Sequence, residues 1–224
     1  MNPTDLFNWI PKFLDPGRQP TRIEGWCTVA KACDLAAAVF ALRPSVAVEI
    51  GIFGGSSLIP IAMAMRVNAY GQVIGIDPWS AVESAKGQTG ANLEWWSALD
   101  HEAIYRGFME AVNSEGVANQ TVALRQTSDQ SKPPDVIDLL HVDGNHGEQA
   151  FRDIERFAPN VRVGGLCYLD DIGWDGGAVG RGAEWVLKNG FAKLYDRDGG
   201  AMFQRVKPMR LARRGRPPKA EKKK

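Results

Sequence analysis

The chain has 224 residues, of which 44% are hydrophobic and 24% are charged, a composition typical of one globular domain with a sizeable core. No apolar run approaches the roughly 20 residues that span a bilayer, and residues 1–15 lack the basic start and uninterrupted apolar stretch of a signal peptide. Cys27, Cys33 and Cys167 form neither a CxxC pair nor a zinc-ligand spacing, as is typical of reduced core cysteines. We therefore expect a cytoplasmic protein that does not bind membranes.

The charge is divided unevenly along the chain. Residues 205–224 carry ten Lys or Arg and one Glu, a net charge of +9, which leaves −8 on the rest. Within this segment, Arg213–Lys219 (RRGRPPK) resembles an AT-hook, an extended basic segment that fits the narrow minor groove of A·T-rich DNA. A generic solubilising or RNA-binding tail explains the same composition. Residues 207–224 contain too few apolar side chains to fold alone, so we expect a disordered tail.

Taken in chain order, the predicted elements alternate between helices and strands. The Ala-rich segment 28–42 has helical spacing and ends before Pro44. The strands predicted next are 46–50, 73–76, 122–125, 137–142 and 166–169, and the helices are 56–67, 101–116, 148–157 and 182–188. Segments 191–195 and 202–206 flank Asp198-Gly199-Gly200, a hairpin signal.

This alternation predicts an α/β fold: a Rossmann-like, doubly wound, mostly parallel seven-stranded sheet that closes with an antiparallel hairpin. We assign it to one domain, residues 1–206, with an N-terminal helical segment. Residues 78–120 form a long insert that contains Trp79, Trp95 and Trp96. This insert either covers the acceptor as a lid or packs a small satellite core, and the sequence leaves both open.

A glycine-rich segment follows the first predicted strand. Three glycines among residues 51–55 allow a sharp turn and a close approach of the backbone to a ligand, and the next helix offers free N–H groups to an anion. The spacing is not GxGxxG, which argues against a dinucleotide. Asp77 ends the second strand, where a carboxylate can accept hydrogen bonds from ribose hydroxyls. The alternative for the glycine-rich segment is a tight strand-to-helix turn that binds no ligand.

Three carboxylates follow two strands that we expect to be adjacent. Asp143 ends one strand, and Asp170 and Asp171 end the next. Acids that converge in this way need a counter-charge, and hard oxygen ligands favour Mg²⁺ or a similar divalent cation. His146 lies close enough to act as a general base in the same cleft. The alternatives are helix caps, lone loop acids and a solvated loop histidine. We interpret His141 as structural.

Together these motifs resemble the class I S-adenosylmethionine-dependent methyltransferases and, among them, the catechol O-methyltransferase-like branch. That branch has E-x-G-x-x-x-G-x-S after its first strand, matched here by Glu49, Gly51, Gly55 and Ser57. The phrase HVDGNHGEQAFRDI also resembles a bacterial group of such enzymes with mostly unassigned substrates. The resemblance covers roughly residues 24–206.

The resemblance implies a role for each matching residue. The glycine loop and Ser57 would hold the methionine end of S-adenosylmethionine, Asp77 the ribose, and Ser128 with Asp129 the adenine. Asp143, Asp170 and Asp171 match the metal triad. The ion would lower the pKa of an acceptor hydroxyl, and Asp143 and His146 would take part in catalysis. His146 replaces the catalytic Lys of the catechol enzymes, which puts the acceptor class in question.

The function expected first is therefore O-methyl transfer to a small molecule or glycan. One alternative is a DNA-associated protein that uses this fold as a scaffold and binds A·T-rich DNA through its tail. A second, a nicotinamide-dependent oxidoreductase, is disfavoured by the glycine spacing. The sequence does not identify the acceptor, and it leaves open whether the chain forms a homo-oligomer.

Overall fold

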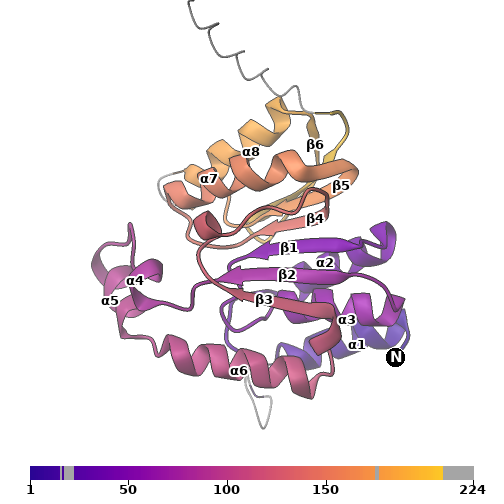
Figure 1. Cartoon of the computed structure of the whole chain (residues 1–224), viewed down its shortest axis with the longest axis horizontal. Helices are drawn as coiled ribbons and strands as arrows, with labels where there is room; N and C mark the ends of the chain where they lie inside the picture. The colour runs from indigo at the N-terminus through magenta and orange to yellow at the C-terminus, as the bar shows by residue number, and fades with distance from the viewer. Residues whose placement is uncertain (16, 18–22, 175–176, 209–224) are drawn as a thin grey trace, which may run out of the picture.

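Figure 1 shows the computed structural model of the chain, which describes residues 1–15, 17, 23–174 and 177–208. Its helices and strands in chain order are α1 (Pro3–Phe13), α2 (Val29–Leu42), β1 (Val46–Ile50), α3 (Leu58–Asn68), β2 (Gln72–Asp77), α4 (Ala81–Ser84), α5 (Gly90–Ala98), α6 (His101–Ser114), β3 (Thr121–Arg125), β4 (Ile137–Val142), α7 (Glu148–Phe157), β5 (Val161–Leu169), α8 (Ala178–Lys188), β6 (Phe191–Arg197) and β7 (Gly200–Arg205). Short 3-10 turns precede β3, follow it, and precede β5.

The strands form one seven-stranded sheet in the order β3-β2-β1-β4-β5-β7-β6. The first five in this order pair in parallel, and β7 pairs antiparallel with both β5 and β6. The predicted doubly wound sheet with its closing hairpin is confirmed. The order reverses direction between β1 and β4, and in such sheets the ligand cleft opens at the carboxyl ends of the strands on either side of that reversal.

Helices cover both faces of the sheet, as its residue pattern requires. All six residues of β4 are buried, as expected for a central parallel strand. Successive side chains point to opposite faces, so Ala47 packs in one core and Val48 in the other. The first core includes residues of α1, α2, α3 and α6, and the second includes residues of α7 and α8. In Figure 1, α7 and α8 lie together, away from α1–α3.

The structure adds detail that local patterns did not predict. Strand β5 begins at Val161 and passes through Gly164 and Gly165, where we expected a strand to start. Gly164 has a φ of +84°, and the pairing of β4 with β5 shifts register near Ile137. A kinked strand interior and a strand boundary both favour glycine, so composition alone does not separate them.

Two short helices, α4 and α5, stand apart from the sheet at one end of the molecule (Figure 1). None of the residues in these two helices is buried.

Within the described ranges, no helix is both long and apolar enough to cross a membrane. Residues 209–224, which contain the AT-hook-like segment, lie outside the described residues.

The buried strand β4 gives a test of this packing. Leu139 is fully buried in the first core, so Leu139→Ala should lower the free energy of unfolding by about 2–5 kcal/mol through lost contacts and a cavity. The matched control is Leu187→Ala on α8, whose side chain is 46% exposed and should change stability by less than about 0.5 kcal/mol. Urea denaturation measures both. Equal effects would contradict the assignment of β4 to the sheet interior.

Candidate active site

The glycine loop between β1 and α3 is fixed by its own backbone geometry. Gly51 has a φ of +86°, and a Cβ there would lie 2.3 Å from the carbonyl oxygen of Asp143. Only glycine brings the end of β1 this close to the end of β4. Asp77 then holds the loop from the side of β2, because its Oδ2 accepts hydrogen bonds from the backbone N–H groups of Ile52 and Phe53, each 2.9 Å long.

A buried polar chain connects this loop to β4. Glu49 on β1 and His141 on β4 are register partners, and both are fully buried. Glu49 Oε1 accepts a hydrogen bond from Ser57 Oγ at 2.8 Å, and its Oε2 lies 3.0 Å from His141 Nδ1. The other ring nitrogen, His141 Nε2, has no hydrogen-bond partner among the described residues and lies 3.9 Å from Asp143 Oδ2. This chain therefore ends with an unpartnered nitrogen beside the acids that follow β4 and β5.

Those acids form a compact cluster. His141, Asp143 and Asp170 each offer a ligand atom, and the three atoms lie within 4.8 Å of one another. Burial and the neighbouring Asp170 carboxylate hold the pKa of Asp143 well above its ordinary value. Burial opposes ionisation of Asp170 too, but His141 and Lys31 outweigh it and lower that pKa. One carboxyl group of the pair therefore keeps its proton more readily than the other.

A lysine from another layer joins the cluster. Lys31 on α2 is only 5% exposed, and its Nζ contacts Asp170 Oδ2. Burial lowers the pKa of Lys31, but Asp143 and Asp170 outweigh this effect, so the pKa is raised overall and the ammonium stays charged. Sequence reasoning missed this residue. A signal existed, because a charged Lys31 occupies the buried face of α2 together with Leu35 and Val39.

Asp171 turns away from this cluster. Its backbone has a φ of +51°, and its Oδ2 lies 3.2 Å from His146 Nδ1. His146 Nε2 lies 4.0 Å from Asp143 Oδ1, and the ring packs edge-on against Trp174 with centroids 5.1 Å apart. Burial lowers the pKa of His146, although Asp171 and Asp170 oppose the shift. Of the predicted metal triad, the structure brings Asp143 and Asp170 together and pairs Asp171 with the predicted base.

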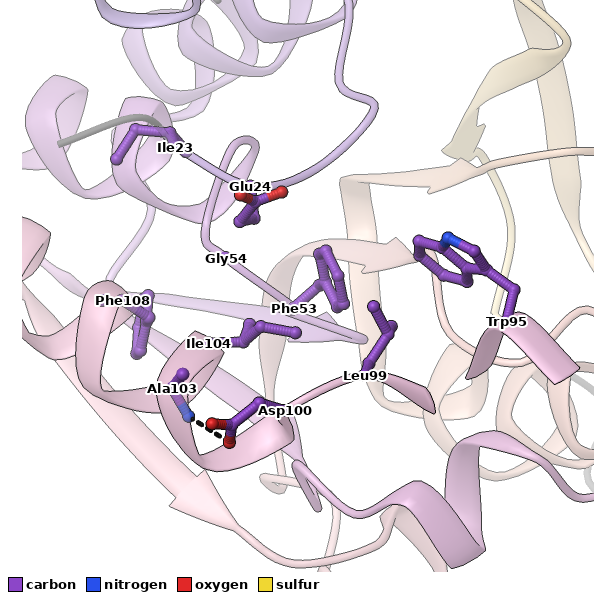
Figure 2. A pocket seen from close by; sticks show the side chains of 11 residues that line it. Ile23, Glu24, Phe53, Gly54, Trp95, Leu99, Asp100, Ala103, Ile104 and Phe108 are labelled. Atoms are coloured by element: carbon purple, nitrogen blue, oxygen red, sulfur yellow. Dashed lines mark hydrogen bonds between the residues drawn. The ribbon is translucent and has the colours of Figure 1, made fainter. Parts of the chain in front are cut away.

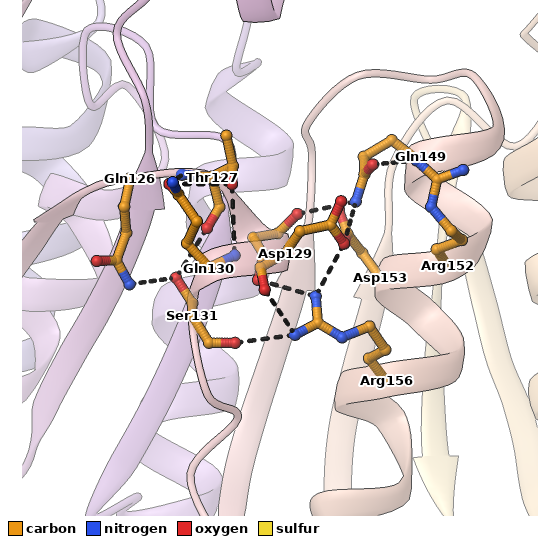
Figure 3. A network of polar contacts seen from close by, with 10 residues as sticks. Gln126, Thr127, Asp129, Gln130, Ser131, Gln149, Arg152, Asp153 and Arg156 are labelled. Atoms are coloured by element: carbon orange, nitrogen blue, oxygen red, sulfur yellow. Dashed lines mark hydrogen bonds and ion pairs between the residues drawn. The ribbon is translucent and has the colours of Figure 1, made fainter.

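The turn after β3 is tied to α7 by a polar network (Figure 3). Gln149 Nε2 donates to Ser128 Oγ at 3.0 Å and to Asp153 Oδ1 at 2.9 Å. Arg156 donates to the carbonyl oxygen of Ser128 at 2.8 Å and pairs with Asp129 at 3.2 Å. Burial raises the pKa of Asp153 to about 6. This network fixes the turn that carries Ser128 and Asp129.

One cleft of about 1010 Å³ joins these parts. Its walls include most of the predicted site residues: Gly51, Ser57, Asp77, Ser128, Asp129, Asp143, His146, Asp170 and Asp171. Two predicted residues lie behind the wall. Glu49 is buried beneath Ser57, and a Cβ on Gly55 would lie 2.7 Å from the Phe108 ring. These two residues shape the loop from within the core.

The tryptophans of the 78–120 insert divide between two roles. Trp79 is buried and stacks on Phe108 with ring centroids 5.4 Å apart. Trp95 and Trp96 instead gather around Trp26 and line the cleft, where Trp26 is 64% exposed and Trp95 is 42% exposed. Trp79 belongs to the main core of the domain and not to a satellite core, and covering of an acceptor by the insert stays a prediction. Trp95 and Trp96 on α5 form an aromatic wall of the cleft together with Trp26.

A second hollow of about 360 Å³ lies beside the glycine loop (Figure 2). Figure 2 shows Phe53, Leu99, Ile104 and Phe108 around it, together with the acids Glu24 and Asp100. One of these acids, Asp100, already accepts a hydrogen bond from the backbone N–H of Ala103 at 2.9 Å. Asp143, Asp170 and His146 line the larger cleft and not this hollow, so we place the candidate active site in the larger cleft.

A doubly wound, mostly parallel seven-stranded sheet that closes with an antiparallel hairpin is the class I methyltransferase fold. The chain belongs to a family of methyltransferase domains, whose profile matches residues 48–172, more than half of the sequence. No curated protein matches the chain. The prediction of a class I methyltransferase is confirmed at the level of family and fold, and the solved structures that share this fold are consistent with the catechol O-methyltransferase-like branch.

Solved O-methyltransferases share this fold. NovP is 19% identical, with a TM-score of 0.66 over 92% of this chain and 100% of NovP. TomG from Streptomyces achromogenes, involved in tomaymycin synthesis and solved in complex with SAM, is 14% identical, with a TM-score of 0.60 over 90% of this chain and 89% of TomG. The Bacillus cereus O-methyltransferase, solved in complex with SAH, is 13% identical, with a TM-score of 0.59 over 91% of each chain.

Asp153 makes the stability of this site depend on pH. Its pKa rises from 3.8 to about 6 on folding, so the folded protein binds the proton more tightly than the unfolded chain does. This proton adds at most about 3 kcal/mol to the free energy of unfolding. The stabilisation is present below pH 4 and is lost as the pH rises through 6. Urea titrations at several pH values should show this loss in the wild type and not in Asp153→Asn. The matched control, exposed Asp135→Asn, should keep the wild-type profile.

Proposed function

We propose that the chain is an S-adenosylmethionine-dependent O-methyltransferase that acts on a hydroxyl group of a small molecule or glycan, assisted by a divalent cation. The observation that carries the proposal is the continuity of the cleft, which joins the glycine loop and Asp77 at one end to His146 and the acid cluster at the other. Relatives of the same fold were solved with SAM or SAH, which supports this choice of methyl donor.

The proposed binding of S-adenosylmethionine uses features of the loop. Asp77 already accepts three backbone hydrogen bonds, from Ile52, Phe53 and Trp79, and a carboxylate has room for about one more. It would therefore hold the loop and contact the ribose with its remaining lone pair. Ser57 stands at the start of α3, where the helix dipole favours the methionine carboxylate. Ser128, held by Gln149, would face the adenine.

His146 is the group best placed to remove the acceptor proton. Its Nδ1 faces the Asp171 carboxylate at 3.2 Å, so Nδ1 carries the hydrogen and Nε2 is the basic nitrogen. The lowered pKa keeps the ring neutral at neutral pH. The acceptor O–H proton would pass to Nε2, and the acceptor oxygen would form a bond to the methyl carbon as the carbon–sulfur bond breaks and its electron pair returns to sulfur. Asp171 would stabilise the imidazolium.

The acid cluster suits a divalent cation. Two carboxylates and an unpartnered imidazole nitrogen are donors for Mn²⁺, Fe²⁺ and similar ions, and the carboxylates alone are donors for Mg²⁺. Glu49 orients His141 through Nδ1, as carboxylates orient metal-binding histidines in other proteins. Asp143 and Asp170 would hold the ion. The third donor would be His141 Nε2, because the ligand atoms of the three residues lie within 4.8 Å of one another. The ion would supply positive charge for an ionised acceptor oxygen.

Calorimetry with S-adenosylmethionine tests the cofactor assignment. Asp77→Ala removes both the loop contacts and the proposed ribose contact, so affinity should fall on the order of 100-fold or more. Asp77→Asn keeps one acceptor oxygen, so its affinity for S-adenosylmethionine should lie between those of the wild type and Asp77→Ala. The matched control is Asp135→Asn, whose exposed side chain should leave affinity unchanged. Tight binding of NAD, or wild-type affinity in Asp77→Ala, would overturn the proposal.

The base is tested with a methyl-transfer assay against a panel of hydroxylated aromatic compounds and glycosides. His146→Ala should lower turnover by roughly 10²–10⁴-fold while the affinity for S-adenosylmethionine stays unchanged. Imidazole added to the solution should restore part of the activity, because it can fill the space of the missing ring and accept the proton. Near-normal turnover in His146→Ala would assign the base role to another group.

A further inference from the structure

Lys31 is the one lysine that the structure places inside the acid cluster, among the described residues. Its helix, α2, buries mostly apolar side chains, and an ammonium at such a position is costly unless it is paired with a carboxylate. Asp170 provides that partner through the contact between Nζ and Oδ2. The lysine is therefore a fixed part of the site and more than a surface charge that happens to be near.

The partner of Lys31 is also a donor of the proposed cation site. Asp170 belongs to the group of three residues whose ligand atoms lie within 4.8 Å of one another. A divalent ion held there would stand beside the ammonium, and like charges at such short range in a poorly solvated site repel strongly. The two cations therefore exclude each other from these carboxylates.

We propose that Lys31 and a divalent cation compete for Asp143 and Asp170, so that Lys31 sets the metal affinity of the site. This inference rests on the proposed cation site. Binding of the ion requires the Nζ group to leave Asp170. The structure offers a route, because Lys31 itself lines the 1010 Å³ cleft and its flexible four-carbon stem can carry the ammonium into that cleft.

The direct test is the affinity of metal-depleted protein for Mn²⁺, measured by calorimetry and by the loss of the free-ion electron paramagnetic resonance signal. Lys31→Met keeps the length of the side chain and removes its charge, so Mn²⁺ should bind on the order of 10–100-fold more tightly than to the wild type. Lys31→Arg keeps a positive charge and should stay close to wild type. The matched control is Lys12→Met on the exposed side of α1, which should change nothing.

A second measurement uses the wild-type protein, so its outcome does not depend on whether a variant folds. Amine-reactive labelling followed by mass spectrometry should find Lys31 protected in metal-depleted protein and labelled several-fold faster once Mn²⁺ is added. The labelling of Lys12 should not respond to Mn²⁺. Protection of Lys31 that Mn²⁺ leaves unchanged would overturn the competition.

The outcomes separate this inference from the proposal on which it rests. Equal Mn²⁺ affinity in wild type and Lys31→Met, or weaker binding in the variant, would overturn the competition and leave the cation site standing. Mn²⁺ binding to neither protein would overturn both the cation site and the competition. The calorimetry with S-adenosylmethionine would still decide methyl-donor binding independently. Tighter binding in Lys31→Met, with no change in Lys12→Met, supports the inference.

Discussion

The central constraint on this molecule is the need to neutralise charge buried at the carboxyl ends of β1, β4 and β5. Glu49 is fully buried on β1 and relies on Ser57 and His141. Asp170 relies on Lys31, which comes from α2 in another layer. An unpaired charge in such a place costs several kcal/mol, so the Asp170 carboxylate depends on the nearby Lys31 ammonium. The docking of α2 therefore stabilises the charged form of Asp170.

The glycine loop is the second rigid part. Phe53 has a φ of +52°, a left-handed conformation that a bulky residue adopts only when its surroundings require it. Asp77 accepts the N–H of Phe53, the indole of Trp79 donates to its carbonyl oxygen at 2.8 Å, and Trp26 stacks on its ring at 5.2 Å. The loop is therefore shaped before any ligand binds, which lowers the entropy lost on binding.

The side of the cleft formed by the insert is less rigidly packed. Helices α4 and α5 bury none of their residues, and the aromatic wall of Trp26, Trp95 and Trp96 stays partly in solvent. Exposed aromatic rings beside a cleft supply large contact areas for a ligand at a low entropic cost. The cleft thus has a rigid side, formed by the glycine loop and the acids, and a side of exposed aromatic rings.

Local patterns in the sequence determined the order of strands and helices, the glycine loop, Asp77 and the acids after β4 and β5. These features follow from periodicity and from the rule that parallel strands present their carboxyl ends to one cleft. Lys31 and His141 escaped such reasoning, because the chemistry of each depends on residues 92 or more positions away. The pairing of Asp171 with His146 depends on one backbone angle, and the division of Trp79 from Trp95 depends on which side of the insert meets the core. Only tertiary packing decides such matters, because it sets which charges and rings share a space.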